Sequence, residues 1–133
     1  MQNQTKTDLK QKKSQQRKVI LEELRNLKIH PTAKQLYAIV QKRIPDVGLA
    51  TVYRNLDLLE KNNKIIKLRS KDKEARYDGC AEKHCHLICR GCGIILDLMD
   101  VDKITIKSKE LDKSGFKIDP SYAEMFGECD HCK

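Results

Sequence analysis

The segment LATVYRNLDLLEKNN, residues 49–63, has the pattern of one amphipathic helix and decides how the first part of the chain folds. The helical repeat places three apolar side chains on its inner face: Val52, Leu56 and Leu59. Asn62 and Asn63 follow directly, and asparagine tolerates the left-handed conformation that closes many helices. The outer face of this helix is polar and is therefore free to meet solvent or a partner.

Two more amphipathic helices precede this segment. In residues 14–28, SQQRKVILEELRNLK, Ser14 is a candidate N-cap, and three apolar side chains share a face: Ile20, Leu24 and Leu27. In residues 30–45, HPTAKQLYAIVQKRIP, Thr32 and Gln35 have capping-box spacing. The sequence therefore predicts three short helices in a row.

The segment KIIKLRSKDKEARYDG, residues 64–79, follows the third helix and has the pattern of a strand, a charged loop and a second strand. Three helices followed by such a β-hairpin predict a winged helix-turn-helix domain over residues 1–78. Residues 1–13 lack an apolar period, so we expect a flexible basic arm or a frayed helix there.

The pattern changes in residues 79–133. HCHLIC and GIILDLM are expected to be strands, residues 100–115 a helix that ends at Gly115, and residues 116–127 a strand broken at Pro120. These elements predict a small α/β domain. The fold class is thus α+β, with a winged helix-turn-helix domain over residues 1–78 followed by a second, small α/β domain over residues 79–133.

The balance of basic and acidic residues also changes near residue 78. The chain carries a net charge of +8, but residues 1–78 hold 19 basic and 9 acidic side chains, whereas residues 79–133 hold 8 and 10. Such an asymmetry favours a polyanion, and nucleic acid above all, as the partner of the first domain. The alternative is a basic surface that only serves solubility.

The start of the helix at residues 49–61 carries the side chains that suit a DNA major groove. Arginine pairs with guanine, asparagine pairs with adenine, and hydroxyls bind bases or phosphates. The candidates for base contacts are Ala50, Thr51, Tyr53, Arg54 and Asn55. Arg17 and Lys13, with the rest of the basic arm, are candidates for phosphate contacts. The alternative is an ordinary polar helix face.

Six cysteines occur in a chain with no apolar run that could serve as a membrane span or a secretion signal. We therefore expect a cytoplasmic protein with no membrane partner. Cytosolic thiols are kept reduced, so these cysteines favour metal binding or redox chemistry over disulfides.

Four of the cysteines form the pairs CRGC and CDHC, separated by enough chain to return the second pair to the first. Four thiolates in a closed tetrahedron suit a structural Zn²⁺ ion, with the ligands Cys89, Cys92, Cys129 and Cys132. Two unrelated reduced pairs or a dithiol redox switch are the alternatives. His131, inside the second pair, is interpreted as a bystander.

His84 and His86 are two residues apart on an expected strand, so their rings share one face while Cys85 points the other way. Such a pair can chelate one ion. Further nitrogen and oxygen ligands are available from His30, Asp78 and Asp97. A mixed shell of this kind suits Fe²⁺ or Mn²⁺. The alternatives are surface polar residues and, for the aspartates, strand-end caps or salt bridges.

The segments ATVYRNLDLLEKNNKI and HCHLICRGCG resemble signatures of the ferric uptake regulator family, and the resemblance extends over about residues 14–132. Within the family the chain looks most like the peroxide-sensing repressors. The resemblance implies a homodimer on a palindromic double-stranded DNA operator and a structural zinc at the four cysteines. It also implies a regulatory metal site formed by His30, Asp78, His84, His86 and Asp97.

The same resemblance implies a function. A metal-dependent transcriptional repressor would sense peroxide when Fe²⁺ chemistry oxidises His30 or His84 and so releases the DNA. Iron sensors of the family tend to carry glutamate at the position of Asp97, so this aspartate favours peroxide sensing. A metalloenzyme or thiol oxidoreductase is disfavoured, because no catalytic base or substrate pocket has a sequence signature.

Two cysteines depart from that pattern. Cys80 lies two residues after Asp78, and zinc-uptake regulators of the family use a cysteine shortly before the H-x-H pair. A zinc- or iron-responsive uptake regulator is therefore the alternative function. Lys83 and Cys85 stand where iron regulators often carry extra ligands, so we expect no accessory metal site.

Overall fold

The computed structural model describes residues 2–69 and 74–132. The chain divides into two compact units, Met1–Ala81 and Glu82–Lys133. The boundary expected from charge and pattern, after Asp78, is three residues earlier. Among the described residues, every helix is too short or too polar to cross a membrane.

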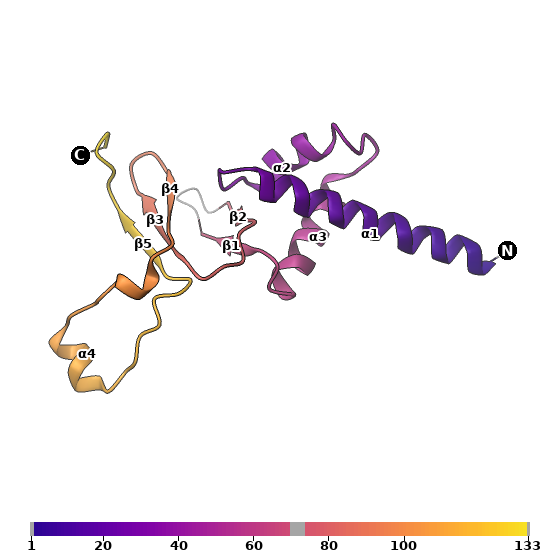
Figure 1. Cartoon of the computed structure of the whole chain (residues 1–133). Helices are drawn as coiled ribbons and strands as arrows, with labels where there is room; N and C mark the ends of the chain where they lie inside the picture. The colour runs from indigo at the N-terminus through magenta and orange to yellow at the C-terminus, as the bar shows by residue number, and fades with distance from the viewer. Residues whose placement is uncertain (1, 70–73, 133) are drawn as a thin grey trace. The chain divides into compact units, whose positions relative to one another are not determined.

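Three helices build the first unit: α1 (Gln2–Asn26), α2 (Ala33–Val40) and α3 (Leu49–Lys61) (Figure 1). Their apolar faces meet in one core, which includes Ile20, Leu24, Leu36, Val40, Val52 and Leu56. The expected capping box between Thr32 and Gln35 begins α2. Asn63, with φ of 57°, adopts the left-handed conformation expected after α3.

The structure corrects the start of the first helix. Residues 2–13 continue α1 as helix and are not a flexible arm, and Ser14 lies inside the helix instead of capping it. The reason is composition: this stretch has no glycine or proline, and its lysines and glutamines are good helix formers. The basic side chains of the arm are therefore displayed at helical spacing.

Two short strands form the wing of the first unit. β1 (Ile66–Leu68) pairs antiparallel with β2 (Arg76–Asp78). The loop expected between them, at residues 70–73, lies outside the described residues. The other edge of β2 bonds to the segment before α2, because Tyr77 N–H donates to the carbonyl of Pro31 at 2.9 Å. This pairing fixes the chain around Pro31 against the wing.

A three-stranded sheet forms the centre of the second unit, in the order β4 (Ile95–Leu98), β3 (Cys85–Cys89) and β5 (Glu124–Gly127). β3 pairs antiparallel with β4 and parallel with β5. The parallel pairing brings residues from near position 127 beside residues from near position 89. Helices and hairpin in one unit and this sheet in the other make the winged helix-turn-helix and α/β halves of an α+β fold.

The connection between β4 and β5 differs from expectation. Only η1 (Val101–Lys103) and α4 (Lys109–Ser114) are helical there, because the β-branched run of residues 104–106 disfavours a helix and Ser108 supplies the N-cap of α4. Gly115 ends the helix as expected. Residues 116–123 are not a strand, since Pro120 lacks a donor and the turn after it places Tyr122 at φ of 67°.

Candidate functional site

The four cysteines of the two C-x-x-C pairs lie together in the second unit. Cys89 ends β3, Cys92 follows in the turn to β4, and the second pair follows β5. Because β3 and β5 are parallel, Cys89 is in register with Gly127, two residues before Cys129. The four sulfur atoms all lie within 4.8 Å of one another.

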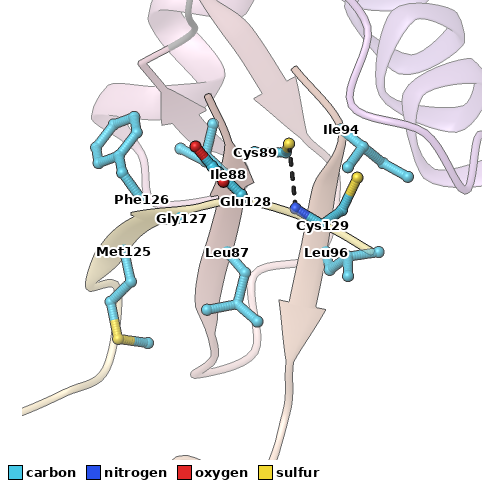
Figure 2. Close-up of a pocket in the computed structure, with 10 residues that line it drawn as sticks. All are labelled: Leu87, Ile88, Cys89, Ile94, Leu96, Met125, Phe126, Gly127, Glu128 and Cys129. Atoms are coloured by element: carbon cyan, nitrogen blue, oxygen red, sulfur yellow. Dashed lines mark hydrogen bonds between the residues drawn. The ribbon is translucent and has the colours of Figure 1, made fainter. Parts of the chain in front are cut away.

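The spacing of these sulfurs fits zinc. Cys92 Sγ and Cys129 Sγ are 3.7 Å apart, and in a tetrahedron with Zn–S bonds of about 2.3 Å the sulfurs are about 3.8 Å apart. Figure 2 shows the Cys89 sulfur facing the backbone nitrogen of Cys129, at 3.3 Å. The donor set is sulfur alone, so the cluster suits a soft, closed site.

Backbone donors prepare one of these thiols for metal. The N–H groups of Cys129 and then of Cys92 lower the pKa of the Cys89 thiol to about 6. In contrast, hydrogen bonds with the thiols of Cys129 and Cys89 raise the pKa of Cys132 to about 12. A cation bound at the cluster would favour the thiolate form of Cys132 and so oppose this rise in its pKa.

Gly91 is a residue of this site that the C-x-x-C pattern alone does not reveal. A Cβ atom at this position would lie 2.6 Å from Cys132 Sγ and 2.7 Å from Cys132 Cβ. Both distances are too short for non-bonded atoms. The second cysteine pair can approach the first only because residue 91 has no side chain.

His84, His86 and Asp97 form a second cluster in the same unit, on the face of the sheet opposite Cys85. His86 and Asp97 are direct cross-strand partners on β3 and β4. Both histidines are fully buried. The Nδ1–H of His84 donates to the carbonyl of Glu82 at 2.6 Å, so its Nε2 carries the lone pair that a metal needs.

The ligand atoms of this cluster fit a mixed nitrogen and oxygen shell. His84 Nε2 lies 2.9 Å from His86 Nε2, and Asp97 Oδ1 lies 3.6 Å and 3.2 Å from these two nitrogens. Neighbouring ligands in an octahedron with bonds of about 2.1 Å are about 3.0 Å apart. Three ligands at such separations hold one face of a shell and leave the remaining positions open.

His30 and Asp78, two of the expected ligands, lie side by side within the first unit. His30 Nε2 lies 3.2 Å from Asp78 Oδ2, and both residues are buried. The pairing of β2 with the chain around Pro31 brings them together, and Arg76 Nε donates to the carbonyl of His30. The sequence alone gave no signal for this support from Arg76.

The two remaining cysteines have different surroundings. Cys80 is half-buried, and its backbone N–H donates to Asp78 Oδ1 at 2.8 Å, so it holds the carboxylate through its main chain. Cys85 is buried with its side chain on the sheet face away from His84 and His86, and burial raises the pKa of its thiol. A raised pKa makes this thiol a poor nucleophile.

The predicted DNA-contacting residues gather at the N-terminal half of α3 and on α1. Ala50, Tyr53 and Arg54 are exposed, and Thr51 is half-buried. On α1, Lys13 is exposed and Arg17 is half-buried. A groove of about 530 Å³ separates the two helices here, lined among others by Lys13, Arg17, Thr51 and Arg54.

Asn55 is the exception among these residues. It is buried, with an exposed fraction of 6%, and lies on the inner side of α3. Its Nδ2 donates to the carbonyl of Thr51 at 2.9 Å, and its Oδ1 accepts from Arg17 Nε at 3.2 Å. Since both ends of its amide are bonded within the protein, Asn55 does not present them to a base in this structure.

Comparison with known proteins gives consistent matches. A model of the ferric uptake regulator family matches residues 8–126. The peroxide operon regulator of Bacillus subtilis (strain 168) is 32% identical over 117 residues, which cover 88% of this chain and 81% of that regulator.

Solved structures agree with these matches. The peroxide stress regulator of Campylobacter jejuni is similar with a TM-score of 0.77 and 26% identity, covering 99% of both chains. The ferric uptake regulator of Helicobacter pylori, described as having three functional metal-binding sites, has a TM-score of 0.74 and 25% identity. That match covers 98% of this chain and 89% of the Helicobacter chain.

Proposed function

Because this chain belongs to the ferric uptake regulator family, we propose that it is a metal-dependent DNA-binding repressor that senses peroxide through oxidation of ligand histidines. The family consists of transcriptional regulators, so we do not adopt the interpretation as an enzyme. The similarity to peroxide regulators from two bacteria supports the peroxide branch over the other branches.

In this proposal one Fe²⁺ or Mn²⁺ ion is bound by ligands from both units. His84, His86 and Asp97 supply one face of its shell, and His30 and Asp78 complete a set of five. The ion then ties α3 and the wing to the second unit. Metal binding is thereby coupled to DNA binding, because it fixes where the recognition helices of a dimer stand relative to each other.

Peroxide sensing would depend on the histidines of this set. An Fe²⁺ ion held by these residues would supply the redox chemistry: one oxygen atom of peroxide would be transferred to the ring of His30 or His84, and the other would leave as water. The carbonyl of Glu82 holds the His84 ring with Nε2 directed toward Asp97, which keeps the ring where oxidation occurs. An oxidised ring is a poorer ligand, so the coupling between the units is lost and DNA is released.

The four cysteines hold a structural Zn²⁺ ion in this proposal, since four sulfurs at tetrahedral spacing leave no open position. The second unit would form the homodimer. An apolar row crosses the exposed face of its sheet, where Leu87 pairs with Leu96 on one side and Met125 on the other (Figure 2). Leu96 is 50% exposed, which a second copy would cover.

The observation that carries this proposal is the convergence of two imidazole nitrogens and one carboxylate oxygen in the cluster of His84, His86 and Asp97. To test it, the Fe²⁺ form is exposed to low peroxide, and operator affinity and peptide masses are measured. We expect affinity to fall as one oxygen atom appears on His30 or His84. Undiminished affinity with unmodified histidines would refute peroxide sensing.

A zinc- or iron-responsive uptake regulator is the second candidate, and Cys80 favours the zinc version. Its position next to the Asp78 carboxylate could let its sulfur replace that oxygen as a ligand. The substitution Cys80→Ser separates the two functions. A large loss of metal-activated DNA binding would favour zinc sensing, whereas unchanged binding is expected for the peroxide sensor.

A further inference from the structure

One face of α1 changes character along its length. In its second half, this face is apolar and buried at Ile20 and Leu24, which belong to the core. Continued toward the N-terminus at helical spacings of four, three and four residues, the same face carries basic side chains: Arg17, Lys13, Lys10 and Lys6. A face that packs on protein at one end is therefore cationic at the other.

The change occurs where α1 runs beyond the helices it packs against. Figure 1 shows the N-terminal half of α1 extending past α2 and α3. Lys13 and Arg17 lie at the beginning of this overhang and line the groove that Thr51 and Arg54 of α3 line from the other side. The cationic face and the exposed start of α3 thus border the same groove.

Carboxylates do not neutralise this groove. Among its described lining residues, Asp46 is the one acidic side chain, and Lys12 already pairs with it at 3.0 Å. Lys12 also lies off the face of Lys10 and Lys13. The positive charge of the cationic face therefore remains available to an anionic partner.

Arg17 is fixed at the inner end of this face. Its Nε donates to Asn55 Oδ1 at 3.2 Å, and the Asn55 amide is itself anchored on the carbonyl of Thr51 at 2.9 Å. Arginine carries four further N–H donors on its two terminal nitrogens. The guanidinium is thus oriented by one nitrogen while the other two remain for a ligand.

We propose that Lys6, Lys10, Lys13 and Arg17 form a track for the phosphates of the DNA strand whose bases α3 contacts, and that Asn55 is the positioning residue of Arg17. This rests on the proposed function as a DNA-binding repressor. The track spans ~16 Å along the helix axis, long enough for several successive phosphates of one strand. Asn55 acts through Arg17 and reads no base.

The track is tested by the salt dependence of binding to a random-sequence DNA duplex, using the full-length protein loaded with Mn²⁺. For Lys6→Gln with Lys10→Gln, each lost phosphate contact should make the slope of log K against log salt less negative by about 0.9, so the affinity ratio between 50 and 200 mM salt falls roughly 3.5-fold per contact. Lys18→Gln, on the same helix but off the track, is the matched control.

The role of Asn55 is tested by a double-mutant cycle on the same duplex. Asn55→Leu should lower the slope as Arg17→Gln does, and the double variant should be no worse than Arg17→Gln alone. In contrast, the effects of Asn55→Leu and Arg54→Gln on the binding free energy should be additive. A second variant tests the same contact if Asn55→Leu folds poorly. Arg17→Lys keeps the positive charge but cannot donate the Nε–H bond to Asn55. We therefore expect its salt slope to lie between those of the unaltered protein and Arg17→Gln.

The outcomes separate the two proposals. If the unaltered protein binds no DNA with any metal, the proposed function fails. If it binds but the Lys6 and Lys10 variant matches the Lys18 control, the track is wrong. If the changes at Asn55 and Arg17 are additive, or if Asn55→Leu weakens only specific sequences, Asn55 is not the positioning residue.

Discussion

Strand β3 contributes residues to both proposed metal sites, which are a set of four cysteine sulfurs and a set of histidine nitrogens and aspartate oxygens. The sulfur set lies within one unit, where the parallel pairing of β3 with β5 brings the two C-x-x-C pairs together. The nitrogen and oxygen set that we propose takes His84, His86 and Asp97 from one unit and His30 and Asp78 from the other. In this proposal a ligand set confined to one unit stabilises that unit alone, whereas a set taken from both units couples metal binding to their arrangement.

The largest effect should come from breaking the sulfur set. We expect Cys129→Ser to lose zinc and to destabilise the second unit by on the order of 5 kcal/mol, because loss of a structural metal removes folding free energy. Metal content and thermal unfolding followed by circular dichroism measure this. His131→Ala, inside the same C-x-x-C pair, is the control and should retain zinc; equal losses in both variants would contradict the assignment.

Breaking the nitrogen and oxygen set should have a smaller and different effect. Asp97→Ala removes the oxygen that lies 3.2 Å from His86 Nε2, so Mn²⁺ affinity should fall about 100-fold while zinc content and folding stay unchanged. Calorimetric titration measures the Mn²⁺ affinity. Asp100→Ala serves as control. Loss of zinc from the Asp97 variant would show that the two sets are not independent.

A methyl group at Gly91 should weaken the sulfur set without removing a ligand. The added Cβ would overlap Cys132 Sγ, and overpacking of this kind costs roughly 2 kcal/mol, or about 30-fold in zinc affinity. Competition with a zinc chelator measures the change. Gly127→Ala is the matched control, because a Cβ atom at residue 127 would have no neighbour within 4 Å. Equal zinc affinity in the two variants would contradict the close approach.

The smallest effect is expected at Gly79, next to the proposed ligand Asp78. A Cβ at this position would lie 3.0 Å from backbone atoms of Arg25, so Gly79→Ala should displace the chain by a few tenths of an ångström. We expect about fivefold weaker Mn²⁺ binding, equivalent to about 1 kcal/mol, with zinc content unchanged. Gly48→Ala, in open space, is the comparison. Unchanged Mn²⁺ affinity would mean that the neighbouring glycine does not position Asp78.

Local patterns predicted the local parts of this molecule. The capping box of Thr32 and Gln35, the left-handed conformation of Asn63 after α3 and the antiparallel wing depend on residues close in sequence, and the structure has all three. The secondary structure of the second unit was predicted less well. Residues 104–106, Ile-Thr-Ile, are all β-branched, and their two apolar side chains are two positions apart, so they oppose the helix expected over residues 100–115.

The candidate sites likewise have parts that local sequence patterns predicted and parts that they did not. C-x-x-C spacing and the alternation of a strand were enough to separate the sulfurs from His84 and His86. The pairing of His30 with Asp78 follows from a backbone contact between β2 and Pro31, which no periodicity encodes. The burial of Asn55 was not predictable for a related reason: its position beside the outer face of α3 says nothing of the α1 arginine that binds its amide.

The arrangement of β3 between two different neighbours also sets an order of folding. Only a tight turn separates β3 from β4, so this hairpin, which pairs His86 with Asp97, closes a short loop and can form in microseconds. Pairing of β3 with β5 must close a loop of more than thirty residues and should come later, when the proposed zinc ion could bind both ends. In a newly made chain the hairpin that pairs His86 with Asp97 would therefore form before the four cysteines meet.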